Sequence, residues 1–528
     1  MLAFQDVTYA HPNKDVLFSG LHFTVNRGEK IALIGPNGAG KSTLLRLMAG
    51  ELQPLSGNIR QDEPPYYIPQ HFGQFDHLTV GEALRAGERL HALREILSGN
   101  VTDARMAALD DDWTIEERCR EALAHWHLAG LPLDLRLAAL SGGQKTRVFL
   151  AGILVNQPAF LLLDEPGNHL DAAGRALLRE LIAGWRQTLV LVSHDATLLR
   201  LLPEVFELGK KGITVYGGGF DFYKEQKAIE QDALRQDLHS REKALRKARE
   251  TEREAMERKA KMDARGRKKQ DKSNVPTIVL NTLRNNAEKS AASLKKAHAE
   301  KMDGIAEEVN RLRKEMPDID KMKLNVDDSA LHKGKVLLTA QALNIRFGER
   351  LLWPEGLDFQ IRSGDRTAIR GGNGSGKTTL IRLLLGELEP SEGTLQRADF
   401  RAVYIDQDYS YLDGGLTVYE QAQRHNPGAL EEHEVKMRLN RFLFGPEDWN
   451  KPSSGLSGGE RMRLLLCVLN IGTKAPDMII LDEPTNNLDM QNVEILTAAI
   501  NGYDGTLLVV SHDGEFLASL GMTGEIAL

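Results

Sequence analysis

The sequence predicts an α/β protein built from two phosphate-loop domains in tandem, joined by a long α-helical hairpin linker. Three observations support this fold class: a glycine-rich motif that occurs twice, further motifs that repeat with it, and a basic segment between the copies. A length of 528 residues favours more than one domain, and 41% hydrophobic and 27% charged residues are typical of globular chains. The net charge of −7 does not by itself indicate a nucleic-acid partner.

The glycine-rich motif has the form G-x-x-x-x-G-K-[ST] at residues 35–42 (GPNGAGKS) and again at 371–378 (GGNGSGKT). Each copy follows an apolar run that predicts a strand and precedes an apolar run with helical spacing. Strand, loop and helix in this order are the context of a phosphate-binding loop. Glycines let several backbone N–H groups face one set of phosphate oxygens, and the helix N-terminus adds its positive end. A turn that binds nothing is the alternative, and the second copy in an equivalent context argues against it.

The residue types of the two loops predict their roles. Lys41 and Lys377 are expected to bridge the β- and γ-phosphates, while Ser42 and Thr378 are expected to hold Mg²⁺. The nucleotide-binding residues predicted from the loops are Gly35, Pro36, Asn37, Gly38, Ala39, Gly40, Lys41, Ser42 and Thr43, and Gly371, Gly372, Asn373, Gly374, Ser375, Gly376, Lys377, Thr378 and Thr379.

Four further motifs follow each loop in the same order. Their sequences are YIPQ at 67–70 and YIDQ at 404–407, LSGGQ at 140–144 and LSGGE at 456–460, FLLLDEP at 160–166 and MIILDEP at 478–484, and SHD at 193–195 and 511–513. The glutamines lie 29 and 30 residues after the loop lysines, and each histidine lies 30 residues after the aspartate of the preceding motif. The equal order and near-equal spacing indicate a duplicated domain.

The apolar runs that end in Asp164 and Asp482 predict buried strands with a carboxylate at the mouth of the sheet, where ligands of α/β proteins bind. These aspartates are candidates for holding Mg²⁺, directly or through water. Glu165 and Glu483 come one residue later, so they point to the other side of the strand. They can polarise an attacking water, which is the general-base position.

With these motifs, the two halves resemble ATP-binding cassette domains, in the order Walker A, Q-loop, signature, Walker B, D-loop and H-switch. Two cassettes on one chain with a long charged linker are similar to the ABC-F family of translation-associated ATPases, and the resemblance covers nearly the whole chain. It implies ATP and Mg²⁺ as ligands and hydrolysis of ATP. It also implies, for each cassette, a mixed α/β core with an antiparallel β part and a helical subdomain.

The resemblance assigns further residues. His194 and His512 would touch the γ-phosphate, although a lone histidine is more often structural. Gln70 and Gln407 would sense Mg²⁺ and the attacking water. Tyr9 and Phe347, which lie 32 and 30 residues before the loop lysines, would stack on adenine; ordinary aromatic residues at a strand end are the alternative.

The signature segments are expected to act across the pair of cassettes. Ser141, Gly142, Gly143 and Gln144 would complete the site built on Lys377, and Ser457, Gly458, Gly459 and Glu460 would complete the site built on Lys41. Two ATP molecules would then join the halves, and hydrolysis would separate them, which gives an open and a closed state.

Two departures from the family pattern are visible. Gly167 stands where the second copy has Thr485, and the second signature ends in Glu460 where the first has Gln144. Neither change removes a reacting group, so both sites are expected to hydrolyse ATP.

The predicted domains are 1–223 for the first cassette, 224–335 for the linker and 336–528 for the second cassette. The first cassette has about 20 extra residues between its glutamine and signature motifs, placed at about 87–113. Two interpretations remain open for them: a short version of the arm that ABC-F proteins insert here, or a longer helical hairpin without a partner.

The linker is basic and contains no aromatic residue. Helices are predicted at about 221–265 and 284–316, the second with a coiled-coil seam at Met302, Ile305, Val309, Leu312 and Met316. Arg265, Arg267, Lys268 and Lys269 lie in the most basic part and are the candidate RNA-binding residues. Without aromatics, contacts with phosphates and shape fit better than base stacking. A solvated charged face is the alternative.

The function expected from the resemblance is an ATP-driven cycle on the ribosome, with 23S rRNA and tRNA as partners and the linker hairpin near the peptidyl-transferase centre. Housekeeping translation and antibiotic resistance both remain open. The rival is an ATPase subunit of a membrane transporter or of a DNA-repair machine. A cytoplasmic monomer with intramolecular cassette pairing and no membrane partner is expected, because no apolar run is long enough to cross a bilayer and no secretion signal is visible. The two cysteines, Cys119 and Cys467, are expected to be reduced thiols.

Overall fold

The computed structural model describes residues 1–12, 15–209, 212–270, 302–309, 311–312, 322, 332, 334–472, 475–486 and 488–528, and at 259, 260 and 262–270 the description covers the backbone alone. The chain divides into two units. The first unit contains both sequence repeats, Met1–Tyr223 and Ile319–Leu528, and the second is the segment Lys224–Asp318. Within the described ranges, no helix is both long and apolar enough to span a bilayer.

The first repeat contains two sheets. The antiparallel sheet has the strand order β2 (Val16–Val25), β1 (Leu2–Ala10), β4 (Ser56–Gln61). The larger sheet has the order β5 (Tyr66–Ile68), β6 (Phe160–Asp164), β7 (Thr188–Val192), β3 (Lys30–Ile34), β8 (Glu204–Gly209), β9 (Gly212–Tyr216). Its first five strands are parallel, and β9 pairs with β8 in the antiparallel sense.

The second repeat has the same plan with one strand fewer in its larger sheet. The antiparallel sheet has the order β13 (Leu357–Arg362), β10 (Val336–Asn344), β15 (Glu392–Arg397), and a short ribbon pairs β11 (Arg346–Phe347) with β12 (Arg350–Leu351). The parallel sheet has the order β16 (Ala402–Ile405), β17 (Met478–Asp482), β18 (Thr506–Val510), β14 (Arg366–Arg370), β19 (Gly524–Ala527).

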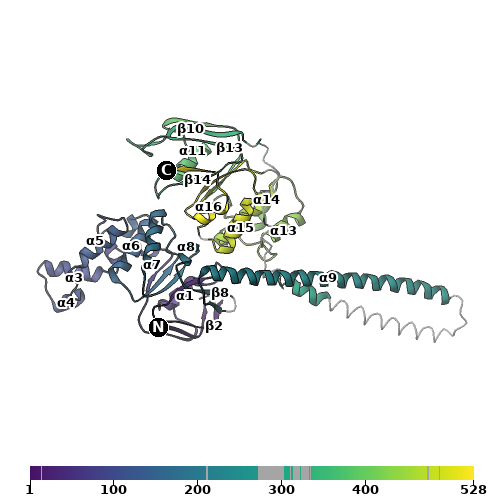
Figure 1. Cartoon of the computed structure of the whole chain (residues 1–528), viewed down its shortest axis with the longest axis horizontal. Coiled ribbons are helices and arrows are strands. Elements are labelled where there is room, and N and C mark those ends of the chain that lie inside the picture. The colour runs from purple at the N-terminus through teal and green to yellow at the C-terminus, as the bar shows by residue number, and fades with distance from the viewer. Residues whose placement is uncertain are drawn as a thin grey trace. The chain divides into compact units, whose positions relative to one another are not determined.

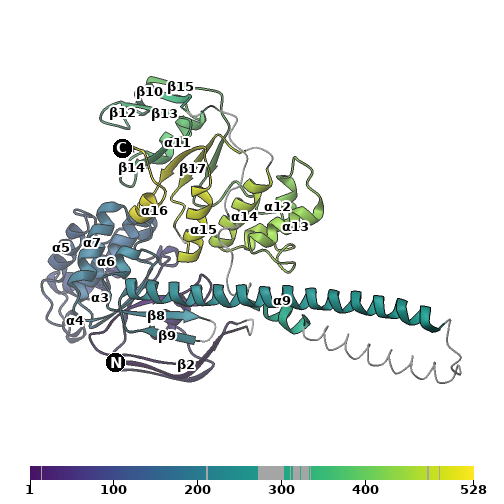
Figure 2. The same cartoon turned by 45° about the vertical axis from the view of Figure 1, so that its right-hand side comes forward.

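The helices also correspond between the repeats, with two exceptions. The helices of the first repeat are α1 (Lys41–Met48), α2 (Val80–Ala83), α3 (Gly87–Leu97), α4 (Asp103–Leu109), α5 (Ile115–His125), α6 (Gly142–Asn156), α7 (Ala172–Gly184) and α8 (Ala196–Leu199). Those of the second are α11 (Lys377–Leu385), α12 (Val418–Arg424), α13 (Glu432–Arg441), α14 (Gly458–Ile471), α15 (Met490–Asn501) and α16 (Gly514–Ser519). The exceptions are α3 and α4 of the first repeat, which have no counterpart among the described helices of the second. Short 3-10 turns lie at Gly73–Phe75, Leu137–Ala139 and Ser453–Gly455. In the second repeat, α12 to α14 lie at one end and the antiparallel sheet at the other (Figure 2).

Alternation along the central strands explains why each repeat has two cores. Successive side chains of a strand point to opposite faces of the sheet. In β3, Ile31 and Leu33 therefore join one hydrophobic cluster, while Ala32 and Ile34 join the other. Strands covered on both faces have apolar residues at nearly every position, as the motifs FLLLD and MIILD do. The carboxyl ends of these parallel strands place the loop, carboxylate and histidine motifs at one edge of the sheet.

The described part of the second unit is helical (Figure 1). Helix α9 runs from Phe220 to Gln270, five residues beyond the predicted end. Residues 302–309 and 311–312 are also helical. Arg241 Nη1 of α9 forms an ion pair with Glu308 Oε2 at 3.1 Å, and Val309 and Leu312 are buried. The predicted seam residue Met316 lies outside the described residues.

Candidate active site

The phosphate loops connect a buried strand directly to a helix in both repeats. β3 ends at Ile34 and α1 begins at Lys41, and β14 ends at Arg370 and α11 begins at Lys377. The last loop glycines, Gly40 and Gly376, have φ of 95° and 96°, a left-handed conformation that favours glycine. A Cβ at Gly376 would also lie 2.5 Å from Leu352 Cδ2. The loop shape therefore requires glycine at these two positions.

The loop lysines fold back onto their own loops. Lys41 Nζ donates to the carbonyls of Gly35 at 2.8 Å and Pro36 at 3.2 Å. Lys377 Nζ donates to Gly371 at 2.9 Å and to Gly372 at 3.1 Å. Burial lowers the pKa of Lys41. Both ammonium groups are thus held at the start of the helix, where an anion is favoured.

The strand-end aspartates lie next to the loops and are held by tyrosines. Tyr67 Oη donates to Asp164 Oδ2 at 3.3 Å, and Tyr404 Oη donates to Asp482 Oδ2 at 2.9 Å. Burial raises the pKa of Asp164 to about 6, against an opposing hydrogen bond from the hydroxyl of Ser42. Burial also raises the pKa of Asp482.

One oxygen of the first aspartate is unused. Among the described residues, Asp164 Oδ1 is buried without a hydrogen-bond partner, while Ser42 contacts the same carboxyl group. An uncompensated buried oxygen is costly. A carboxylate at the end of β6 and a hydroxyl in the first turn of α1 are the hard oxygen ligands that Mg²⁺ takes together with phosphates. The residues present therefore fit Mg²⁺.

Each candidate base is in contact with the candidate histidine of its own repeat. Glu165 Oε1 lies 3.2 Å from His194 Nε2, and Glu483 Oε1 lies 3.3 Å from His512 Nε2. The backbone N–H of each histidine donates to the other carboxylate oxygen at 3.3 Å. Both glutamates have φ of 48°, a left-handed conformation that costs about 1–3 kcal/mol for a residue with a side chain. Such strain is typical of functional positions.

Burial shifts the protonation of these groups. It raises the pKa of Glu165 and of Glu483 to about 7. Burial, with the nearby ammonium of Lys41, lowers the pKa of His194 to about 3, and burial with Lys377 lowers the pKa of His512 to about 4. Both imidazoles are therefore neutral near pH 7, and both carboxyl groups can bind or release a proton there.

The signature serines cap their helices. Ser141 caps α6 in a capping box with Gln144, and Ser457 caps α14 in the same way with Glu460. Both serines are exposed, whereas Gly459 is buried. The capping box accounts for the polar residue at the end of both motifs, glutamine in one and glutamate in the other.

Within the first unit, loops of the two repeats contact each other. Asn37 of the first phosphate loop donates its backbone N–H to Asp489 Oδ2 at 2.9 Å. Asn373 Nδ2 of the second loop donates to the carbonyl of His169 at 2.9 Å. A Cβ on Gly143 would lie 3.2 Å from Asn373 Nδ2, so the first signature lies beside the second phosphate loop.

Other predicted residues take less specific positions. Tyr9 is half-buried and makes an edge contact with His11 at 5.8 Å between ring centroids, and Phe347 is 58% exposed. Gln70 is half-buried and Gln407 is exposed. The side chains of Arg265, Arg267, Lys268 and Lys269 lie outside the described residues, although their backbone belongs to α9.

Sequence reasoning missed three contributors. Tyr67 and Tyr404 hold the strand-end aspartates. The sequence does contain a pattern that marks them, because each tyrosine lies three residues before the motif glutamine. Trp353 is buried and donates Nε1 to the carbonyl of Ser375 at 2.9 Å, which supports the second loop. Its place in the first repeat is taken by Phe18, whose ring packs against Gly40. Because the two repeats use different aromatic residues at this place, the role of Trp353 does not show as a repeated residue in the sequence.

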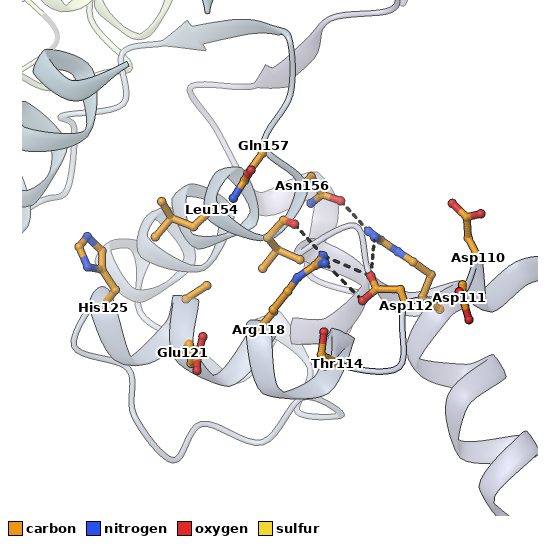
Figure 3. A pocket seen from close by; sticks show the side chains of 13 residues that line it. Asp110, Asp111, Asp112, Thr114, Arg118, Glu121, His125, Leu154, Asn156 and Gln157 are labelled. Carbon is orange, nitrogen blue, oxygen red and sulfur yellow. Dashed lines mark hydrogen bonds and ion pairs between the residues drawn. The ribbon is translucent and has the colours of Figure 1, made fainter. Parts of the chain in front are cut away.

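A pocket of about 960 Å³ lies elsewhere in the first repeat, at the C-terminal end of α6 (Figure 3). Its centre is an ion-pair network: Asp112 contacts Arg89 and Arg118 at 3.2 Å each. Arg118 Nη2 also donates to the carbonyl of Val155 at 2.9 Å. This network ties the end of the signature helix to the loop that follows α4.

Comparisons with known proteins agree with this geometry. A family model described as ABC transporter matches residues 18–168 and again residues 354–486. The tylosin resistance ATP-binding protein TlrC of Streptomyces fradiae is 31% identical over 97% of this chain and 94% of its own length. ABC transporter F family member 4 of Arabidopsis thaliana is 29% identical over 94% of this chain and 69% of its own.

The fold also matches a solved structure. That of RNase-L Inhibitor has a TM-score of 0.60 and 21% sequence identity, and the match covers 98% of this chain and 86% of the other. The predicted fold class, two phosphate-loop domains in tandem with a helical segment between them, is confirmed.

Proposed function

The chain belongs to the ABC-F family of ATP-binding cassette proteins and hydrolyses ATP, and on this premise we propose that it uses two ATP molecules at the junction of its cassettes to drive a closed and open cycle on the ribosome. The observation that carries the proposal is the mutual contact of the loops. Asn37 of one phosphate loop bonds to Asp489, and Asn373 of the other bonds to His169. A phosphate group bound at either loop would therefore lie near residues of both cassettes.

Each phosphate loop binds one triphosphate in this proposal. The glycine backbone N–H groups surround the phosphates, and Lys41 and Lys377 exchange their loop carbonyls for phosphate oxygens. This exchange is feasible because the lysine contacts are with neutral carbonyls of the same loop. Ser141 and Ser457, at the N-termini of α6 and α14, approach the triphosphate from the other cassette.

Ser42 and Asp164 would hold Mg²⁺ in the first site, and Thr378 and Asp482 would hold it in the second, with Gln70 and Gln407 nearby. The chemistry that Mg²⁺ supplies when bound is neutralisation of charge on the phosphate oxygens. Tyr67 and Tyr404 orient the aspartates by donating to one carboxylate oxygen each, which leaves the other oxygen available.

Glu165 and Glu483 serve as the general bases. Each positions a water molecule and accepts its proton at a carboxylate oxygen, and a pKa of about 7 suits this task near neutral pH. The neutral imidazoles of His194 and His512 fix the orientation of these carboxylates through the contacts at 3.2 and 3.3 Å. They also reach toward the terminal phosphate.

The linker is proposed to act on RNA. Its net charge is positive on an otherwise acidic chain, and it lacks the aromatic residues that stack on single-stranded bases. In the ABC-F family the linker hairpin approaches tRNA and the peptidyl-transferase centre. The name of TlrC connects that relative with tylosin resistance, so ribosome protection and a housekeeping role in translation are both candidate versions of this function.

The cycle is tested by co-sedimentation. The variant with both Glu165→Gln and Glu483→Gln should hold ATP without hydrolysing it and should pellet with ribosomes in ATP but not in ADP. The matched control is Glu180→Gln, an exposed glutamate of α7. Equal sedimentation in both nucleotides would contradict the cycle, and the absence of ribosome binding in both would favour a different ATPase class.

The linker role is tested by salt dependence. Changing Arg265, Arg267, Lys268 and Lys269 to alanine should weaken ribosome binding and reduce its salt slope by about 0.7–0.9 for each phosphate that is no longer neutralised. The control replaces four basic residues elsewhere on α9, Lys243, Arg246, Lys247 and Arg249. An unchanged slope in the first variant would show that these charges are merely solvated, and an equal change in both variants would show that the effect is not specific to this part of α9.

A further inference from the structure

Helices α8 and α16 are the same element in the two cassettes. Each begins directly after a Ser-His-Asp motif, with Asp195 and Asp513 as the N-caps. His512 lies between β18 and α16, so the position of α16 contributes to where His512 Nε2 lies relative to Glu483 Oε1, 3.3 Å away. Whatever holds α16 also affects the geometry of the second ATP site.

One arginine joins α16 to the first cassette. Arg200, the C-cap of α8, forms an ion pair through Nη1 with Glu515 in the first turn of α16. Its Nε also donates to Asp221 Oδ1 at 2.9 Å, and Asp221 lies in the first turn of α9. One guanidinium group therefore contacts the first turns of two helices (labelled in Figure 1).

The contact has no counterpart related by the repeat. Counting from the motif aspartates, Ala518 corresponds to Arg200 and Thr197 corresponds to Glu515. Alanine and threonine cannot form an ion pair. The hydroxyl of Thr197 instead donates to Asp195 Oδ1 at 2.6 Å, inside its own turn. An ion pair between these helix positions is thus present on one side of the junction only.

The exposure of the three side chains argues for a positioning role over a stabilising one. Arg200 is 38% exposed, Glu515 43% and Asp221 70%. Ion pairs at such positions contribute little to the free energy of folding. A planar guanidinium that donates from Nε and Nη1 to two carboxylates nevertheless fixes their relative placement.

We propose that Arg200 is a positioning residue for the second ATP site: by binding Glu515 it holds α16, and with it His512, in the geometry that serves Glu483. Because Asp221 shares the guanidinium, the first turn of α9 is connected to the same site through one side chain. The inference rests on the proposed role of His512 but does not depend on ribosome binding. The first ATP site, with Ala518 and Thr197 in the equivalent places, lacks this support.

The test compares Arg200→Ala in two parent chains, one carrying Glu165→Gln and the other Glu483→Gln. Relative to its parent, the variant should lower kcat about twofold to fivefold in the Glu165→Gln chain, where the second site remains intact. It should leave kcat unchanged in the Glu483→Gln chain, and KM for ATP should change little in either. An equal loss in both chains would overturn the proposal. If Glu483→Gln alone leaves ATP turnover unchanged, the proposed role of Glu483 in the second ATP site is contradicted, and not the role of Arg200 alone.

Charge reversal separates positioning from general damage. Arg200→Glu and Glu515→Arg should each lower kcat in the Glu165→Gln chain. The chain with both changes should recover part of the loss, because the carboxylate introduced at position 200 also faces Asp221. Arg200→Lys should lower kcat less than Arg200→Ala does, because it keeps the positive charge. Arg179→Ala changes an exposed arginine of α7 and should have no effect on kcat. The melting temperatures of all variants should agree closely. Losses that simply add in the doubly changed chain, at equal melting temperature, would overturn the role of the pair.

Discussion

In the first cassette Glu165 lies 3.2 Å from His194, and in the second Glu483 lies 3.3 Å from His512. Both glutamates share the same left-handed φ of 48°, and burial raises the pKa of both to about 7. The groups proposed to react with ATP are therefore duplicated almost without change, as expected where small displacements are costly for catalysis.

The partners of Asp171 and Asp489 within their own cassettes are less alike. Asp171 Oδ1 accepts from Arg147 Nη2 at 2.6 Å, whereas Asp489 Oδ1 accepts from Asn492 Nδ2 at 2.7 Å. Arg463 occupies the position of Arg147 in the second signature helix. The ion pair between Arg200 and Glu515 has no equivalent at all. The comparison shows that the groups proposed to react are repeated, whereas the ion pair between Arg200 and Glu515 occurs on one side of the junction only.

The largest expected effect concerns the bases. Glu165→Gln and Glu483→Gln should each lower ATP turnover at their own site about 100-fold or more, because the amide cannot accept the proton of water. Steady-state ATPase rates check this, with Glu180→Gln as the control. If one of the two variants retained the full rate, the two sites would not be equivalent, and the two glutamates would not share the role of general base.

A smaller effect is expected at the loop glycines. Gly376→Ala should destabilise the second cassette by about 1–3 kcal/mol, because φ of 96° is strained for alanine and its Cβ would lie 2.5 Å from Leu352 Cδ2. Gly167→Ala is the control, since a Cβ there meets Leu198 Cδ1 at an ordinary 3.8 Å. Chemical denaturation measures both. Equal stability of the two variants would contradict the need for glycine in the loop.

The smallest effect separates the two tyrosines. Tyr404→Phe should cost more than Tyr67→Phe in affinity for Mg²⁺-ATP, because the hydroxyl of Tyr404 lies 2.9 Å from its aspartate and that of Tyr67 lies 3.3 Å away. A hydrogen bond to a charged group contributes about 1.5–3 kcal/mol, and only part of that differs between the two tyrosines, so the difference should be a few-fold at most. Titration calorimetry can resolve it. A larger loss for Tyr67→Phe would reverse the order expected from the distances.

Much of this fold was predictable because its signals are local. Local residue types and a fixed order along the chain mark each of these features. They are the phosphate loops, the strands that end in Asp164 and Asp482, and the histidine motifs. Tyr67 could have been found in the same way, because Tyr404 repeats it. The support of the second loop by Trp353 could not, since the first cassette uses Phe18 and the contact depends on packing.

The pairing of Arg200 with Glu515 was also beyond the sequence. The two residues are separated by 315 positions, and neither belongs to a motif. Their contact depends on how two cassettes approach each other, which local pattern does not encode. A contact that occurs only once between two repeats leaves no repeated residues in the sequence by which it could be predicted.

The central claim is that each ATP site is completed by the opposite cassette, and the most direct measurement changes one signature at a time. Ser141→Arg would place a bulky cation in the first signature, two residues before Gly143, where a Cβ would lie 3.2 Å from Asn373 Nδ2 of the second phosphate loop. It should abolish the remaining turnover of the Glu165→Gln chain, in which the Lys377 site is intact, and largely spare that of the Glu483→Gln chain. The reverse pattern, with loss only in the Glu483→Gln chain, would show that each cassette completes its own site and would contradict the account.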